Sequence, residues 1–194
     1  MTPQVSFHDL HPAPADMRAE VLEGLGEDPK SIPPKFFYDR RGSELFDAIT
    51  ELPEYYPTRT EIGILERHGK EMAERLGRDA LLVELGSGSS RKIRVLLEAL
   101  EPAVYVPVDI SKEHLLASAT GLARSFPALE VHATCADYSA PFEVPVDDPQ
   151  RTRVAFFPGS SIGNFDPDDA RGFLERVGGV LGQGGRRLIV VDLI

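Results

Sequence analysis

Short apolar runs alternate with amphipathic segments along the chain after about residue 80. The runs are of strand length, and we expect five strands at residues 81–85, 104–110, 129–133, 154–157 and 188–193. Apolar residues at helical spacing predict helices at 91–100, 112–126 and from 166 to about 181. Strands joined by such helices need crossover connections, so the pattern predicts a doubly wound parallel α/β sheet.

Proline positions refine this pattern. Pro107 falls inside the second expected strand, and it cannot donate a ladder hydrogen bond. Two interpretations follow: the strand lies at an edge of the sheet, or its ladder is irregular there. Asp166 followed by Pro167 and two further acids is typical of a helix start.

The first 57 residues contain eight prolines, and this spacing predicts short helices and turns rather than sheet. Thr58 and Glu61 have the spacing of a capping box, which predicts a helix from there to about Leu76. We therefore expect a helical N-terminal arm over 1–78 and a core over 79–194. Because an apolar strand normally needs a covering element, the end of the sequence at residue 194 suggests a core truncated after about five strands.

Composition narrows the possible partners. The net charge of −10 would repel a phosphate backbone, and the sequence has no basic cluster, so we expect no nucleic-acid partner. No leader pattern and no run of membrane-spanning length is visible, so we expect no membrane partner and a cytoplasmic location. We also expect a monomer. The single cysteine, Cys135, is expected to be a core residue, and the five histidines lack ligand spacing, which predicts no metal site.

The segment around residues 81–92 predicts a cradle for a nucleoside cofactor. Gly86 and Gly88 follow the first core strand and permit a tight turn with close ligand approach. The third small residue of a dinucleotide fingerprint is replaced by Arg91, which disfavours NAD and FAD. Glu84 is a poor neighbour for a pyrophosphate but tolerates a cationic, phosphate-free cofactor tail. S-adenosylmethionine has this character.

Two acids follow the next strands. Asp109 ends the second strand at the spacing of a ribose-binding acid, and the alternative is a helix cap. Asp137 follows the third strand, where it is placed to accept from an adenine amino group while Tyr138 packs on the ring. A turn formed by the Asp137 side chain is the alternative.

Small and polar residues fill the end of the fourth strand at 156–165, and they are suited to contact a substrate beside the cofactor or simply to form a turn. Asn164 offers the amide there. Ser161 fits a hydrolase nucleophile pattern, but every histidine precedes it, so the required triad order is absent. The arm is rich in aromatics, whose hydroxyls are suited either to hold an amine or to pack within the arm.

Several segments together resemble the histidine-specific Nα-methyltransferases, which make hercynine on the route to ergothioneine. The segments are residues 34–50, 52–61, 84–92, 106–111, 135–138 and 156–165, within a resemblance that covers 31–194. The resemblance implies a class I methyltransferase core with a Rossmann-like sheet, S-adenosylmethionine as cofactor and L-histidine as substrate. It also implies that the residues reading the imidazole lie beyond residue 194.

The resemblance assigns roles to individual residues. The implied cofactor contacts are Gly86, Lys92, Asp109, Asp137 and Tyr138, to which the turn adds Gly88. The implied histidine contacts are Tyr38, one of Tyr55 and Tyr56, and Asn164. The alternative to a cofactor contact for Lys92 is a solvent-exposed position on a helix. At the level of function, the alternatives are a methyltransferase for another amino acid or small amine, and a noncatalytic cofactor-binding fragment.

Overall fold

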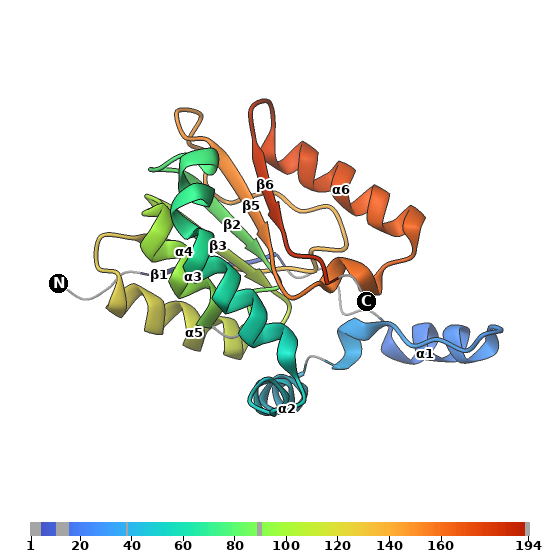
Figure 1. Cartoon of the computed structure of the whole chain (residues 1–194). Helices are drawn as coiled ribbons and strands as arrows, with labels where there is room; N and C mark the ends of the chain where they lie inside the picture. The colour runs from blue at the N-terminus through green and yellow to red at the C-terminus, as the bar shows by residue number, and fades with distance from the viewer. Residues whose placement is uncertain (1–4, 11–15, 38, 89–90, 193–194) are drawn as a thin grey trace.

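The computed structural model describes residues 5–10, 16–37, 39–88 and 91–192. Six strands form one parallel sheet in the order β1-β4-β3-β2-β5-β6 (Figure 1). They are β1 (Val5–Asp9), β2 (Leu81–Leu85), β3 (Val104–Asp109), β4 (Glu130–Cys135), β5 (Arg153–Phe157) and β6 (Arg186–Ile189). The doubly wound parallel sheet predicted from the sequence is confirmed.

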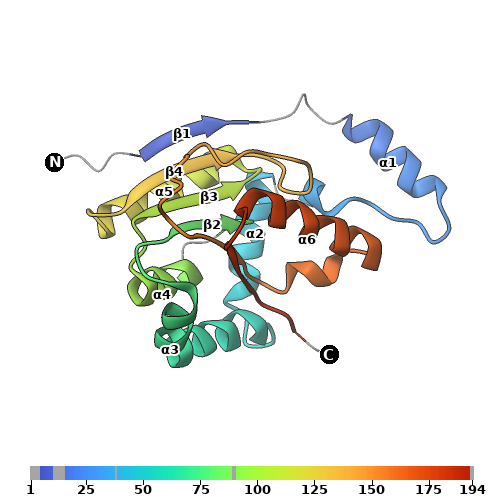
Figure 2. The same cartoon turned by 90° about the horizontal axis from the view of Figure 1, so that it is seen from above.

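Helices cover both faces of the sheet. They are α1 (Met17–Gly26), α2 (Arg40–Thr50), α3 (Tyr56–Leu76), α4 (Arg91–Leu100), α5 (Lys112–Ser125) and α6 (Pro167–Leu181), with short 3-10 helices at Pro34–Phe37 and Ser161–Asn164. One core cluster joins α3, α4 and α5 to one face of the sheet, and a second joins α6 to the other. The helix α1 extends away from this layered core (Figure 2), and α2 lies below the core in the view of Figure 1.

The strand β1 corrects the expectation that the arm contains no sheet. Residues Val5–Asp9 pair in parallel with β4, from Val5 beside Val131 to Asp9 beside Cys135. Alternating apolar side chains, Val5 and Phe7, pack against the core from this strand. Five residues with two apolar positions carry too weak a period to be recognised without their partner strand.

Pro107 lies in the interior of the sheet, so the edge interpretation is wrong. β3 runs between β2 and β4, and Pro107 stands beside Glu84 of β2. On the other side, the ladder with β4 pairs Tyr105 and Val108 but omits the two residues between them. The irregular ladder is therefore the correct interpretation, since proline has no N–H to donate.

The capping-box prediction is also wrong. The helix α3 begins at Tyr56, two residues before Thr58, with a proline in its first turn. Thr58 and Glu61 are both buried, and Tyr55, the N-cap residue, makes no side-chain capping bond. The carboxyl end at Leu76 agrees with the prediction.

The order of the strands places a ligand site at one edge of the sheet. From β2 the chain proceeds outward through β3 and β4, and it then returns to the other side of β2 to form β5 and β6. The carboxyl ends of β2 and β5 therefore flank a topological switch point, where open α/β sheets bind ligands. Among the described residues, no helix has the length and apolar character needed to cross a membrane.

Candidate active site at the carboxyl edge of the sheet

The turn after β2 is bound to the neighbouring strand. Gly86 has a φ of +75°, a backbone conformation that favours glycine. The N–H groups of Gly86 and Ser87 both donate to the Val108 carbonyl of β3, at 2.9 and 3.0 Å. A Cβ added at Gly88 would meet nothing within 4 Å, so there is open space at this position. The turn is thus fixed in shape and leaves room for a ligand.

Glu84 lies beneath this turn and is only 2% exposed. The Tyr105 hydroxyl of β3 donates a short hydrogen bond to its carboxyl group, and Ser87 Oγ lies 3.2 Å from the same hydroxyl. Burial raises the pKa of Glu84 to about 7, although the bonds from Tyr105 and Ser87 oppose the shift. A pKa of about 7 makes Glu84 titrate near neutral pH, a property that the local sequence does not reveal because it depends on burial.

Asp109 ends β3 and orders the start of the next helix. Its Oδ1 accepts a hydrogen bond from the Ser111 N–H at 2.8 Å, and Ser111 is the N-cap residue of α5. Burial raises the pKa of Asp109 above its ordinary value. The Asp109 carboxylate thus forms part of this local turn. It lies at the carboxyl edge of the sheet, on the strand next to β2.

Asp137 follows β4, and its side chain forms the local turn that was the alternative prediction for this residue. Its Oδ1 accepts a hydrogen bond from the Ser139 N–H at 2.9 Å. The adjacent Tyr138 ring lies close to the glycine turn, where a Cβ on Gly86 would be 3.5 Å from the Tyr138 hydroxyl. The ring also makes an edge contact with Phe157 of β5, with centroids 5.7 Å apart. The structure thus brings Asp137 and Tyr138 to the same edge as Gly86.

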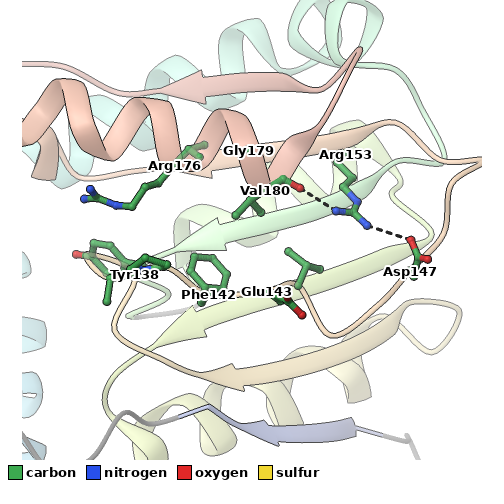
Figure 3. A pocket seen from close by; sticks show the side chains of 12 residues that line it. Tyr138, Phe142, Glu143, Asp147, Arg153, Arg176, Gly179 and Val180 are labelled. Carbon is green, nitrogen blue, oxygen red and sulfur yellow. Dashed lines mark hydrogen bonds and ion pairs between the residues drawn. The ribbon is translucent and has the colours of Figure 1, made fainter.

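A cavity of about 570 Å³ opens beside Tyr138, between α6 and the segment that follows β4 (Figure 3). Phe142 and Val177 contribute apolar side chains to its lining. Farther along the cavity, the Arg153 guanidinium lies 3.3 Å from the Asp147 carboxylate. The cavity gives a planar group room next to the Tyr138 ring.

Lys92 makes a buried ion pair. Its ammonium lies 2.6 Å from Glu61 of α3, and the two side chains are only 15% and 4% exposed. The same carboxylate accepts from the Gly159 N–H, at 3.2 Å from each oxygen. The solvated alternative for Lys92 is therefore wrong. The local sequence did not indicate this role of Glu61, because its spacing from Thr58 suggested a helix cap.

The turn after β5 has an unusual backbone. Gly159 and Ser160 have successive positive φ values of +77° and +57°. The short helix Ser161–Asn164 follows directly, and Asn164 is its exposed last residue. Asn164 is thus presented close to the switch point, on the β5 side of the glycine turn.

The two adjacent tyrosines of the arm have different surroundings. The Tyr55 ring packs edge-on against Phe46 of α2, with centroids 6.1 Å apart. The Tyr56 hydroxyl instead donates to Asp192 just after β6 at 2.7 Å, and this bond raises the pKa of Tyr56. The Asp192 N–H in turn donates to Ser160 Oγ at 2.9 Å. Tyr56 therefore reaches the carboxyl edge, while Tyr38 lies outside the described residues.

The remaining polar candidates are not arranged for metal or thiol chemistry. Among residues 5–10, 16–37, 39–88 and 91–192, no group of three or more metal-ligating side chains is present. Cys135 is buried, and burial raises the pKa of its thiol to about 11. A thiol with this pKa stays protonated near neutral pH and is a poor nucleophile, in agreement with a core role.

This sheet and its glycine turn at the switch point place the chain in the class I methyltransferase fold. A solved structure from Thermobifida fusca YX, provisionally described as a methyltransferase, superimposes with a TM-score of 0.54. It covers 88% of this chain and 64% of that one at 19% identity, a likeness of fold alone.

Residues 17–194 match the family described as histidine-specific, S-adenosylmethionine-dependent methyltransferases, and the chain belongs to this family. It is 44% identical over 183 residues to the histidine N-alpha-methyltransferase of Mycobacterium tuberculosis, covering 92% of the chain and 56% of that protein. It is 37% identical over 175 residues to ergothioneine biosynthesis protein 1 of Neurospora crassa, covering 84% of the chain and 19% of that protein. The chain thus spans about half the length of the bacterial relative.

Proposed function

We propose that the protein transfers methyl groups from S-adenosylmethionine to the α-amino group of L-histidine and forms Nα,Nα,Nα-trimethylhistidine, or hercynine, in ergothioneine biosynthesis. The observation that carries this proposal is the 44% identity to a histidine N-alpha-methyltransferase over 92% of the chain. The family match over residues 17–194 supports the cofactor.

The carboxyl edge of the sheet supports a cofactor site. The proposed cofactor contacts are Gly86, Gly88, Lys92, Asp109, Asp137 and Tyr138. The open space at Gly88 leaves room for a nucleoside at the strand ends, and the cavity that begins beside Tyr138 adds room next to the Tyr138 ring. When bound, the cofactor supplies a methyl group activated by a sulfonium, so little acid catalysis by the protein is needed.

The protein's own contribution is to orient the amine. Tyr56 and Asn164 lie near the switch point and are proposed to hold the α-amino and carboxylate groups of histidine, together with Tyr38. The contact of Tyr55 with Phe46 favours Tyr56 over Tyr55. In each transfer the neutral amine attacks the methyl carbon while the carbon–sulfur bond breaks and its electron pair stays with the sulfur. The nitrogen releases a proton to water after the first and second transfers, and the third leaves a quaternary ammonium that has no proton to release. Fixed orientation of the reactants provides most of the rate enhancement.

The arm of residues 1–78 is proposed to complete the substrate pocket of the core over 79–194. Tyr56 supports this role of the arm because it joins the arm to the carboxyl edge, and the ion pair between Arg91 and Glu51 connects the arm to the start of α4. A hollow of about 600 Å³ also lies between the arm and the start of α5. The monomeric state and the cytoplasmic location stay predictions of the sequence.

The test is an assay of the full-length protein with methyl-deuterated S-adenosylmethionine, followed by mass spectrometry of the products. Histidine is expected to gain up to three labelled methyl groups, while a panel of other amino acids stays unlabelled. Labelling of another amino acid in place of histidine would support the broader methyltransferase alternative. Cofactor binding without any labelled amine would indicate a noncatalytic cofactor-binding module.

A further inference from the structure

One buried carboxylate connects three elements around the switch point. Glu61 extends from α3, pairs with Lys92 at the start of α4, and accepts the N–H of Gly159 after β5. Its 4% exposure means that water cannot replace these partners freely. A buried charge that loses its partner is strongly unfavourable, so the three elements hold one another in place.

The position of this pair relative to the cofactor site follows from the topology. The expected ribose and adenine contacts, Asp109 and Asp137, follow β3 and β4 on one side of the glycine turn. Lys92 and Gly159 follow β2 and β5 on the other side, and a Cβ on Gly159 would lie 3.5 Å from the Lys92 ammonium. A cofactor held with its nucleoside over β3 and β4 would therefore have its sulfonium end on the side of Lys92.

This placement creates an electrostatic problem. The methyl donor carries a positive sulfonium, and an unpaired ammonium in a poorly solvated site would repel it. The Glu61 carboxylate neutralises the ammonium and leaves Lys92 able to donate its remaining N–H groups. The product, S-adenosylhomocysteine, has a neutral sulfur and does not meet this repulsion.

We propose that Glu61 is a positioning residue that neutralises Lys92 and holds the Gly159 turn, so that the site accepts a sulfonium. The inference rests on the proposed function only in its use of S-adenosylmethionine as cofactor. It assigns Glu61 no contact with the reacting atoms. It predicts that loss of the carboxylate discriminates between two ligands that differ by one methyl group and one charge.

The test compares the affinities of the full chain for S-adenosylmethionine and S-adenosylhomocysteine by calorimetric titration at one fixed pH. In Glu61→Gln, the amide oxygen can still accept from Gly159, but Lys92 loses its counter-charge. We expect the affinity for S-adenosylmethionine to fall about tenfold relative to that for S-adenosylhomocysteine. The matched control is Glu66→Gln, the same change at an exposed position of α3, which should leave the ratio unchanged.

Two further variants keep the test decisive if Glu61→Gln folds poorly. Lys92→Met leaves the carboxylate unpaired, so the ratio should move in the opposite direction, toward the sulfonium ligand. The double variant Glu61→Gln/Lys92→Met removes both charges and should restore the ratio of the unmodified protein. Equal losses for both ligands in every variant would overturn the proposal and leave Glu61 a purely structural residue. Absence of binding of either ligand to the unmodified chain would count against the proposed function instead.

Discussion

Replacement of Glu84 by Gln should make the protein more stable at neutral and alkaline pH. The side chain is buried beneath the glycine turn, and its pKa rises from 4.5 to about 7 on folding. Gln has nearly the same shape, and its amide oxygen can accept the Tyr105 hydroxyl bond. Unlike a glutamate carboxylate, the Gln amide carries no charge that has to be removed from water when the protein folds.

The size of the effect follows from proton linkage. Between pH 4.5 and 7 the unfolded chain has lost the Glu84 proton while the folded protein retains it, so the free energy of unfolding decreases as the pH rises. A difference of about 2.5 pKa units corresponds to about 3 kcal/mol. The stabilising contribution of the neutral carboxyl is therefore complete below about pH 4.5 and is lost as the pH rises through about 7.

Urea denaturation of both proteins between about pH 5 and 8.5 measures this difference. The stability of Glu84→Gln relative to the unmodified protein should rise by about 1.4 kcal/mol per pH unit and level off above about pH 7. The same comparison is made in a Tyr105→Phe background, which lacks the hydrogen bond that opposes the pKa shift of Glu84. There the stability difference between the proteins with and without the Glu84→Gln change should level off at a higher pH. The exposed Glu66→Gln change is the control. A stability difference that is constant over this pH range would contradict the raised pKa of Glu84 in the folded protein.

Three further predictions concern packing and site geometry. Gly69→Ala places a Cβ 2.9 Å from that of Ala99, so α3 and α4 must separate. We expect the free energy of unfolding, measured by urea denaturation, to fall by about 1–3 kcal/mol despite the better helix propensity of alanine. An unchanged free energy would contradict this close contact. Gly86→Ala forces an L-residue to a φ of +75° and should cost about 1 kcal/mol, with weaker calorimetric binding of S-adenosylhomocysteine; unchanged stability and binding would contradict it. Tyr56→Phe should raise the KM for histidine severalfold in the full-length protein, whereas Tyr55→Phe should not, and equal KM effects would reject the distinction between them.

Local sequence patterns predicted the central sheet because each strand and helix there has its own period. The expected strand 81–85 agrees with β2, in which every residue is buried, and the expected helix 91–100 agrees with α4, which is buried on one face. The role of Pro107 stayed open, because strand order depends on contacts between distant segments. Its interior position became known only from the pairing of β3 with both β2 and β4.

The site was predicted in part for a similar reason. Residues such as Gly86 and Asp109 follow strands, and parallel strands bring their ends to one edge, so their proximity follows from the topology. Glu61 and Asp192 have partners far away in the sequence, Lys92 and Tyr56, and no local spacing predicts such pairs. For Glu61 the local pattern was misleading, because a buried ion-pairing acid and a helix-capping acid can have the same spacing.

The strand β1 has a consequence for the order in which the sheet assembles. It comes first in the chain, yet its partner is β4, and the adjoining His8 and His132 are 124 positions apart. Contacts so distant in sequence form slowly, so β4 remains an open edge while the interior strands are already paired. An open parallel edge can recruit a strand from another molecule. Docking of residues Val5–Asp9 therefore covers the edge of β4 and leaves β1 as the outermost strand of the sheet, and the concentration of protein during folding decides whether this internal strand or a neighbouring chain reaches β4 first.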